Sequence, residues 1–204
     1  MKDKEITKRN LINAVGEIIN TSGFNKVKIS KVAKSAGVDR KLIYRYFGNL
    51  NNLVEAYIVE NDYWMRFADH IKLLLKDQDP NDSRSIITQI LQEQFTFFFD
   101  QKEMQKLILM ELGENNPLMR SIHNARESLG QHFFEMTDDH FEKSYVNFRA
   151  VAALLVGGIY YVILHTRNNG YSFADVNLKT EKGKEAMLET IAKIVEWAYQ
   201  AAAQ

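Results

Sequence analysis

The 204-residue chain has no cysteine, only two prolines, and no net charge. The lack of cysteine excludes disulfides and thiolate metal sites. Both prolines, Pro80 and Pro117, lie in polar breaks, so long helices are permitted almost everywhere else. The chain also lacks HExxH, GxSxG and glycine-rich phosphate-loop motifs, so the common hydrolase and nucleotide-binding signatures are missing.

The residues that are present indicate a globular chain with an uneven distribution of charge. Hydrophobic residues make up 46% and charged residues 25%, a composition and length that suit one domain or two small ones. Residues 1–50 hold 11 Lys and Arg against 4 Asp and Glu, which leaves 15 against 22 for residues 51–204. A basic amino-terminal part of this kind suggests contact with a polyanion.

No segment of the sequence reads as a targeting signal or a membrane span. The amino terminus, MKDKEITKRNLINAV, mixes charges with apolar residues, unlike a signal peptide, and a cytoplasmic location is expected. Residues 150–164, AVAALLVGGIYYVIL, form an uncharged run of 15 residues, whereas a span needs about 20. We therefore expect a buried or helix-pairing segment and no membrane partner.

Hydrophobic spacing predicts an all-α fold, because no alternating strand pattern competes with the helical one. Three short helices are expected to form a helix-turn-helix domain over residues 1–48. It continues into a larger helical domain over residues 49–204, giving about nine helices in all. The predicted helices are 5–22, a short one ending at Gly37, a third capped by Asp39 and ending at Phe47, one continuous seven-turn helix from Leu50 to Leu75, and 83–100, 103–112, 117–137, 144–168 and 181–202, with a polar loop over 168–180.

Residues 32–47, VAKSAGVDRKLIYRYF, show the pattern of a helix-turn-helix. Ala33 lets two helices approach, and Gly37 accepts the positive φ that the turn requires. Helical spacing points cations and a tyrosine outward from the third helix, where they can contact bases and phosphates. A merely solvated basic face is the alternative. The DNA-contact candidates are Lys28, Ser30, Arg40, Lys41, Leu42, Tyr44, Arg45 and Tyr46.

Residues 5–55 resemble the DNA-binding domain of the TetR/AcrR family of transcriptional regulators. The resemblance rests on a first helix ending in Gly23-Phe24, on VAKSAGVDRKLIYRYF, and on a following helix that opens LNNLVEAY. It implies a homodimer whose paired third helices enter successive major grooves of a palindromic double-stranded operator. It further implies a regulator, most simply a repressor, that a small-molecule effector releases from DNA.

The same resemblance implies an effector cavity in the larger domain. Residues with an apolar body and a polar tip are the better candidates to line it, although any single aromatic residue is more often part of the core. The effector is expected to be small and apolar or amphipathic. The ligand-binding candidates are Trp64, Met110, His123, Tyr161 and His165.

The last two predicted helices have features of a dimer interface. Small residues such as Gly157 and Gly158 keep one helix thin, and the other carries an apolar stripe that includes Ile194. Two such helices from each subunit would form a four-helix interface, so we expect a homodimer through residues 144–202. The alternative is that both helices belong to the core of a monomer.

A catalytic centre lacks support in the sequence. His132, Glu135 and Asp139 have the spacing of one helix face, but Asp139 is expected beyond the helix end. His123 and His132 are nine residues apart, about 900° around a helix, and so point to opposite faces. No catalytic residue, metal or cofactor is therefore predicted. A helical enzyme and a basic-headed module that binds membranes or proteins remain the alternative functions.

Overall fold

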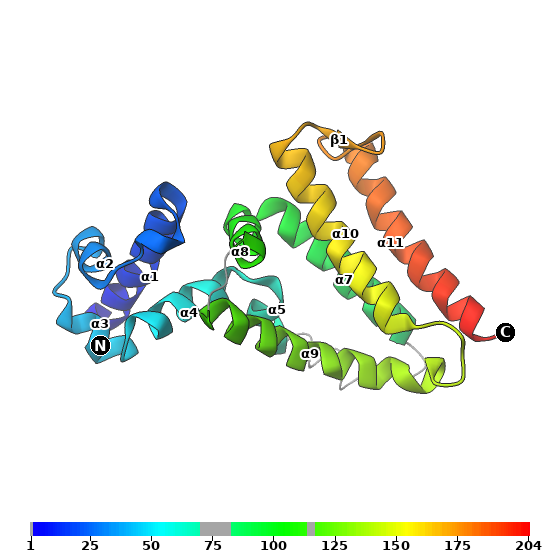
Figure 1. Ribbon diagram of the computed structural model, residues 1–204, viewed down its shortest axis with the longest axis horizontal. Helices are drawn as coiled ribbons and strands as arrows, with labels where there is room; N and C mark the ends of the chain where they lie inside the picture. Colours follow the sequence, from blue (N-terminus) through cyan, green and yellow to red (C-terminus); the bar gives the residue numbers. More distant parts are fainter. Residues whose placement is uncertain (1, 70–82, 114–116) are drawn as a thin grey trace.

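The computed structural model describes residues 2–69, 83–113 and 117–204. These residues form an elongated, almost entirely helical molecule, with the amino-terminal helices at one end and α10 and α11 at the other (Figure 1). The expected all-α fold is confirmed. The part of the predicted seven-turn helix beyond residue 69, and Pro80, lie outside the described residues.

The amino-terminal end is a helix-turn-helix unit. Its elements are α1 (Lys2–Ser22), the short 3₁₀ helix η1 (Phe24–Lys26), α2 (Ile29–Ala36), α3 (Lys41–Phe47) and α4 (Leu50–Asn61). The apolar spacing of α1 buries one face against α2 and α4. The fully buried residues Leu11, Val15, Val32, Ile43 and Leu53 hold these helices together.

The remaining described helices build the body of the molecule: α5 (Tyr63–Arg66), α7 (Ser83–Asp100), α8 (Lys102–Gly113), α9 (Pro117–Phe141), α10 (Phe148–Asn168) and α11 (Glu181–Ala202). α7 packs against both α10 and α11. α10 begins four residues later than the predicted helix over 144–168, because Asn147 caps it by accepting a hydrogen bond from the Ala150 N–H at 3.1 Å.

The predicted continuous helix from Leu50 is wrong at Asp62. This residue is extended, with φ −98° and ψ 131°, and so ends α4. Its Oδ1 accepts a hydrogen bond from the Met65 N–H at 3.1 Å, which caps the new helix α5. The apolar spacing continues across the interruption, which is why the sequence pattern hid it.

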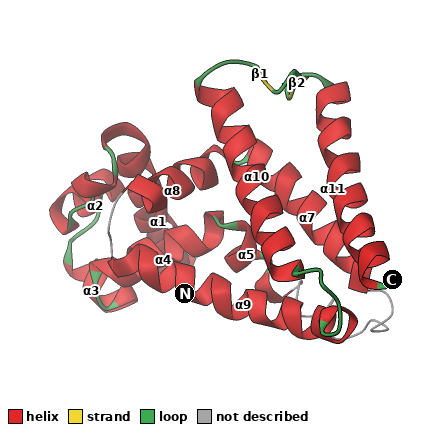
Figure 2. Ribbon diagram, turned by 45° about the vertical axis from the view of Figure 1, so that its right-hand side comes forward, coloured by secondary structure: helices red, strands yellow, loops and turns green. Residues whose placement is uncertain are grey.

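The polar loop predicted over residues 168–180 contains a small hairpin. Strand β1 (Ser172–Phe173) pairs antiparallel with β2 (Val176–Asn177) at the connection between α10 and α11 (Figure 2). Ala174 and Asp175 form its turn with φ of 49° and 61°, the backbone sign of a type I′ turn. A pair of two-residue strands is too short for an alternating pattern to reveal.

α10 has one property of a membrane-spanning helix. It has 21 residues and a mean hydropathy of 1.7 over its most apolar stretch, which makes it long and apolar enough to span by length and composition. Only 28% of that stretch is buried within the chain. Because the core helix of a soluble protein passes the same test, this feature alone is weak evidence for a membrane. What it establishes is an apolar helix with an uncovered side.

The apolar core of the helix-turn-helix unit reaches into the body. We call this core the head cluster. It contains buried residues of α1 to α4 together with Leu107 of α8 and Met119 and Ile122 of α9. α8 and α9 are therefore in direct packing contact with the helix-turn-helix unit.

Candidate DNA-binding surface and effector cavities

The turn between α2 and α3 is fixed by Gly37. This residue adopts the left-handed conformation, φ 67° and ψ 31°, in which other residues are strained. The N–H of Gly37 bonds to the Lys34 carbonyl at 3.2 Å, and that of Val38 bonds to the Ala33 carbonyl at 3.0 Å. Ala33 is buried between the helices, as its size predicts. These bonds set the direction in which α3 leaves the turn.

The orientation of α3 is set by a buried side chain and by a hydrogen bond at the start of the helix. Ile43 is fully buried in the head cluster. The N-cap position of α3 is Arg40, whose side chain makes no capping hydrogen bond, but Asp39 Oδ1 one residue earlier accepts a hydrogen bond from the Lys41 N–H at 2.7 Å. With Ile43 inward, the opposite face of α3 is directed to solvent.

That outward face carries Arg40, Lys41, Tyr44 and Arg45, all exposed, with Tyr44 at 51%. Within the described part of the chain, none of its three cations forms an ion pair with a carboxylate. By contrast, Arg9 of α1 pairs with Glu60. The α3 cations are thus available to an external anion.

The other four predicted DNA-contact residues divide into two kinds. Lys28, directly before α2, and Ser30, in the first turn of α2, are both exposed at the start of that helix. Leu42 and Tyr46 are half-buried. Tyr46 packs against the head cluster, so its role in DNA contact stays a prediction.

Sequence reasoning missed Lys4 of α1. Its Nζ lies 6.0 Å from the centroid of the Tyr46 ring, as does the guanidinium carbon of Arg45. Two cations from different helices therefore meet at one ring. The only signal in the sequence was the general excess of positive charge near the amino terminus.

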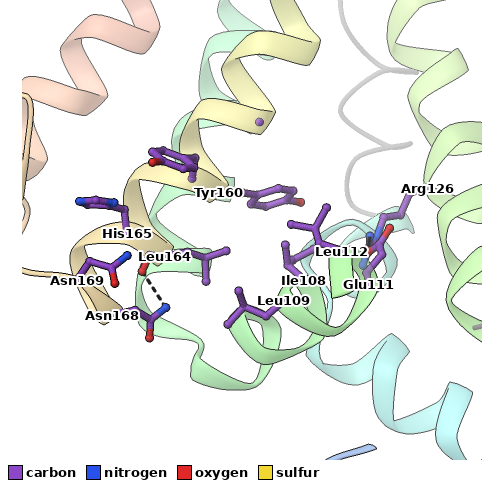
Figure 3. A pocket seen from close by; sticks show the side chains of 12 residues that line it. Ile108, Leu109, Glu111, Leu112, Arg126, Tyr160, Leu164, His165, Asn168 and Asn169 are labelled. Carbon is purple, nitrogen blue, oxygen red and sulfur yellow. Dashed lines mark hydrogen bonds and ion pairs between the residues drawn. The ribbon is translucent and has the colours of Figure 1, made fainter. Parts of the chain in front are cut away.

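Two cavities in the body are bordered by residues that the structure describes. The α8–α10 cavity has a volume of about 500 Å³ (Figure 3), and the α9–α10 cavity about 410 Å³. Both volumes fall in the range of small-molecule sites. The α8–α10 cavity is bordered by residues such as Ile108, Leu109, Leu112, Tyr160 and Leu164, and the α9–α10 cavity by residues such as Ile87, Leu91, Phe134, Phe148 and Val156.

Three of the five predicted ligand-binding residues border these cavities. Tyr161 and His165 border the α8–α10 cavity, their rings stacked with centroids 5.7 Å apart, and Trp64 borders the α9–α10 cavity. Met110 packs against the head cluster and His123 is exposed on α9, and neither borders either cavity. Ligand contact by any of the five stays a prediction.

Arg126 of α9 borders both cavities and was missed by the sequence analysis. Its Nη2 lies 2.5 Å from Asp62 Oδ2, and its Nη1 lies 2.5 Å from Glu111 Oε2. The exposed fractions of these side chains are 12% for Arg126, 0% for Asp62 and 21% for Glu111. Burial disfavours the charged guanidinium, but the two carboxylates outweigh it and raise the pKa of Arg126.

A hydrogen bond links side chains that border the two cavities. Trp64 Nε1, beside the α9–α10 cavity, donates to the Tyr160 hydroxyl, beside the α8–α10 cavity, at 3.1 Å. Burial raises the pKa of Tyr160 to about 12, so its hydroxyl stays protonated at neutral pH. A ligand in either cavity would therefore adjoin the same polar pair.

No metal centre is found among the residues that the structure describes, since no three His, Asp or Glu side chains there are grouped to hold an ion. The side chain of His132, part of the weak candidate with Glu135 and Asp139, lies outside that description.

The glycine-fixed turn, the buried scaffold and a cationic face with no carboxylate partner among the described residues are the features of helix-turn-helix DNA-binding proteins. Comparison with known proteins supports this class and narrows it. Residues 11–57 match the family described as bacterial regulatory proteins, tetR family. It is therefore the amino-terminal domain of the chain that matches the tetR family.

A curated relative matches only part of the chain. The HTH-type transcriptional regulator BetI of Proteus mirabilis (strain HI4320) is 35% identical over 78 residues. That alignment covers 38% of this chain and 39% of the length of BetI. This match supports the class of helix-turn-helix DNA-binding proteins. The remaining 62% of the chain lies outside the alignment.

Solved structures match nearly the whole chain at low identity. FadR from Bacillus subtilis, solved in complex with stearoyl-CoA, has a TM-score of 0.65 at 17% identity and covers 92% of this chain and 96% of its own. NalD, the secondary repressor of the MexAB-OprM multidrug efflux pump in Pseudomonas aeruginosa, has a TM-score of 0.62 at 19% identity and covers 95% and 97%. At such identities the likeness establishes the fold.

Proposed function

We propose that this protein is a transcriptional repressor that binds a palindromic double-stranded operator as a homodimer and leaves it when a small effector enters the body. The observation that carries the proposal is the exposed face of α3, whose cations have no carboxylate partner among the described residues. Such a face on a rigid helix suits the major groove.

Each residue type on this face has a role in reading DNA. Arg40 and Arg45 can make bidentate contacts to guanine, and Lys41 can contact guanine or phosphate. The Tyr44 hydroxyl can donate to a phosphate oxygen. Lys28 and Ser30 can contact the DNA phosphates. Such contacts would fix the position of the protein along the duplex without reading the base sequence.

An uncovered apolar surface on α10 and α11 supports the homodimer. On α10, Leu154 is 79% exposed and the small residues Gly157 and Gly158 are exposed, and on α11 Trp197 is 58% exposed. Exposed apolar surface of this kind marks an interaction site. A second copy, related by a two-fold axis, would cover it through residues 144–202 and set two α3 helices about 34–36 Å apart.

The two cavities support an effector that is small and apolar or amphipathic, because their linings are mostly apolar with a few polar groups. The matched relatives are transcriptional regulators, which favours a regulator over an enzyme here. Neither a catalytic role nor a cofactor is part of the proposal. A cytoplasmic location accords with action on DNA.

Selection from random-sequence duplex DNA, followed by sequencing, tests the proposal. We expect a palindrome with two half-sites one helical turn apart. Alanine at a base-reading position among Arg40, Lys41 and Arg45 should cost about 1–3 kcal/mol on the recovered operator and relax the preference at one base pair. Lys182→Ala, at an exposed cation of α11, is the matched control and should bind normally. Weak, uniform binding to every duplex would contradict the proposal and favour a basic-headed binding module instead.

A further inference from the structure

We propose that the effector is an amphiphile with a single anionic head, which binds the Arg126 guanidinium and displaces Glu111 from it. This inference rests on the proposed function only in taking the cavities as the effector site. Arg126 is the side chain that borders both cavities and holds a full positive charge inside the body.

The guanidinium has an unused donor. The Nε of Arg126 is buried and has no hydrogen-bond partner among the described residues, although Nη1 and Nη2 are both engaged. A buried donor on a charged group is unfavourable when it makes no hydrogen bond, so an oxygen acceptor bound here would stabilise the site. An anionic head supplies acceptors. A cationic head brings only donors and would leave the Nε of Arg126 without an acceptor.

The two carboxylates on Arg126 differ in how firmly they are held. Asp62 is fully buried, and its two oxygens are both occupied, one by the α5 cap and one by Arg126. Glu111 is partly exposed and lies in the last turn of α8, with Arg126 as its ion-pair partner. Glu111 is therefore the carboxylate that is closer to water and has fewer bonds to lose. An incoming anion therefore replaces Glu111 and keeps one guanidinium between two negative charges.

The surroundings suit an apolar tail on that head. The other charged residues at the cavity walls are already neutralised or open to water: Arg149 is paired with Asp138 at 2.6 Å, and Glu127 is exposed. Aromatic and aliphatic side chains form most of the remaining lining (Figure 3). A tail in either cavity would start beside Arg126.

Release of Glu111 from Arg126 would also affect helices that contribute to the head cluster at the DNA-binding end. Glu111 is on α8, and Leu107 of the same helix is buried in the head cluster. Arg126 is on α9, which contributes Ile122 to that cluster, and its partner Asp62 ends α4. An anion at Arg126 thus changes a contact shared by α8, α9 and the end of α4, three helices that contribute to the head cluster.

Calorimetric titration of the full chain without DNA tests this inference separately from operator binding. The probes share one tail length and differ in the head: decanoate and decyl sulfate, decanol, and decylammonium, each below its micelle concentration. We expect the anionic probes to bind at least about tenfold more tightly than decanol, the value of one charge-assisted hydrogen bond. Glu111→Gln should strengthen decanoate binding severalfold and leave decanol binding unchanged.

Glu127→Gln is the matched control, because it removes the same charge at a cavity wall and leaves the Arg126 pairs intact. It should leave the affinity for decanoate unchanged. In the double variant Asp62→Asn/Arg126→Gln, the anionic preference should disappear. If that protein does not fold, Glu111→Gln alone decides. The inference is overturned if decylammonium binds most tightly, if Glu111→Gln behaves as Glu127→Gln does, or if no probe binds. A failure to recover a palindrome would bear on the proposed function and leave these binding results unaffected.

Discussion

Tyr57 has a hydroxyl whose hydrogen bonding is unmet. It is buried in the head cluster, and among the described residues nothing accepts from or donates to its oxygen. Burial, and secondarily the charge of Glu103, raises its pKa from 10.0 to about 12. The folded state therefore holds the tyrosine proton more tightly than the unfolded chain does.

Tyr57→Phe should raise the free energy of unfolding by about 1 kcal/mol, because it removes a buried polar atom that has no partner. At alkaline pH, the variant should also lose less unfolding free energy than the parent does. As pH rises from about 10 to about 12, the unfolded parent gives up this proton first, and the folded state is disfavoured. Urea denaturation at neutral and at alkaline pH measures both effects.

Tyr63→Phe is the control for that variant. The Tyr63 hydroxyl donates to the Ile90 carbonyl and to Glu93 Oε2, both at 3.3 Å, so its removal should destabilise the protein. Equal losses for the two variants would show that the Tyr57 hydroxyl has a partner after all.

At the scale of elements, the contact between α1 and α4 depends on a glycine. A Cβ at Gly16 would lie 2.6 Å from Tyr57 Cε2, closer than real Cβ atoms approach. Gly16→Ala should therefore cost about 1–3 kcal/mol of unfolding free energy through overpacking. Gly130→Ala in α9, where the nearest atom is 4.0 Å away, should instead stabilise by up to about 1 kcal/mol. Thermal melts followed by circular dichroism compare them, and a neutral Gly16→Ala would refute the tight packing.

The interruption between α4 and α5 depends on Asp62. Asp62→Asn keeps a capping oxygen but removes the charge opposite Arg126, and should cost about 3 kcal/mol. Asp62→Ala also loses the cap and should cost about 1 kcal/mol more. Urea titrations of both variants give these differences. If the Asp62→Asn variant were as stable as the parent, the ion pair would contribute nothing net to folding.

Local patterns in the sequence predicted most helices, since apolar spacing, Gly37 and the Asp39 hydrogen bond act within a few residues. The interruption at Asp62 was missed because neither Gly nor Pro marks it. Its stabilising partner, Arg126, is 64 residues away in the chain.

The candidate sites also divide into one that local sequence determines and one that distant residues form together. The cationic face of α3 was predictable, because the burial of Ile43 alone fixes which side of this short helix is exposed. The Arg126 site was not, because its three charged members come from α9, the α4–α5 junction and α8. Such a site exists only after tertiary packing.

For the whole molecule, the apolar side of α10 is the feature that most needs a partner. Leu154→Glu should convert the proposed dimer to a monomer in sedimentation velocity, because a carboxylate would be buried at the two-fold axis. Operator affinity should fall with it, since each monomer reads one half-site.

Ile6→Glu is the matched control, an exposed apolar residue on α1 at the opposite end of the molecule. It should sediment as the parent does. A Leu154→Glu protein that remained dimeric would place the subunit contact elsewhere.

The head cluster limits how freely the parts of this molecule can be exchanged. Because Leu107, Met119 and Ile122 are buried with residues of α1 to α4, a fragment ending at residue 61 would leave an apolar patch in water. Grafted onto the body of a relative, the same fragment would meet different side chains at that seam. The DNA-reading end of this protein is therefore not a portable module, and its sequence is constrained to change together with that of α8 and the start of α9.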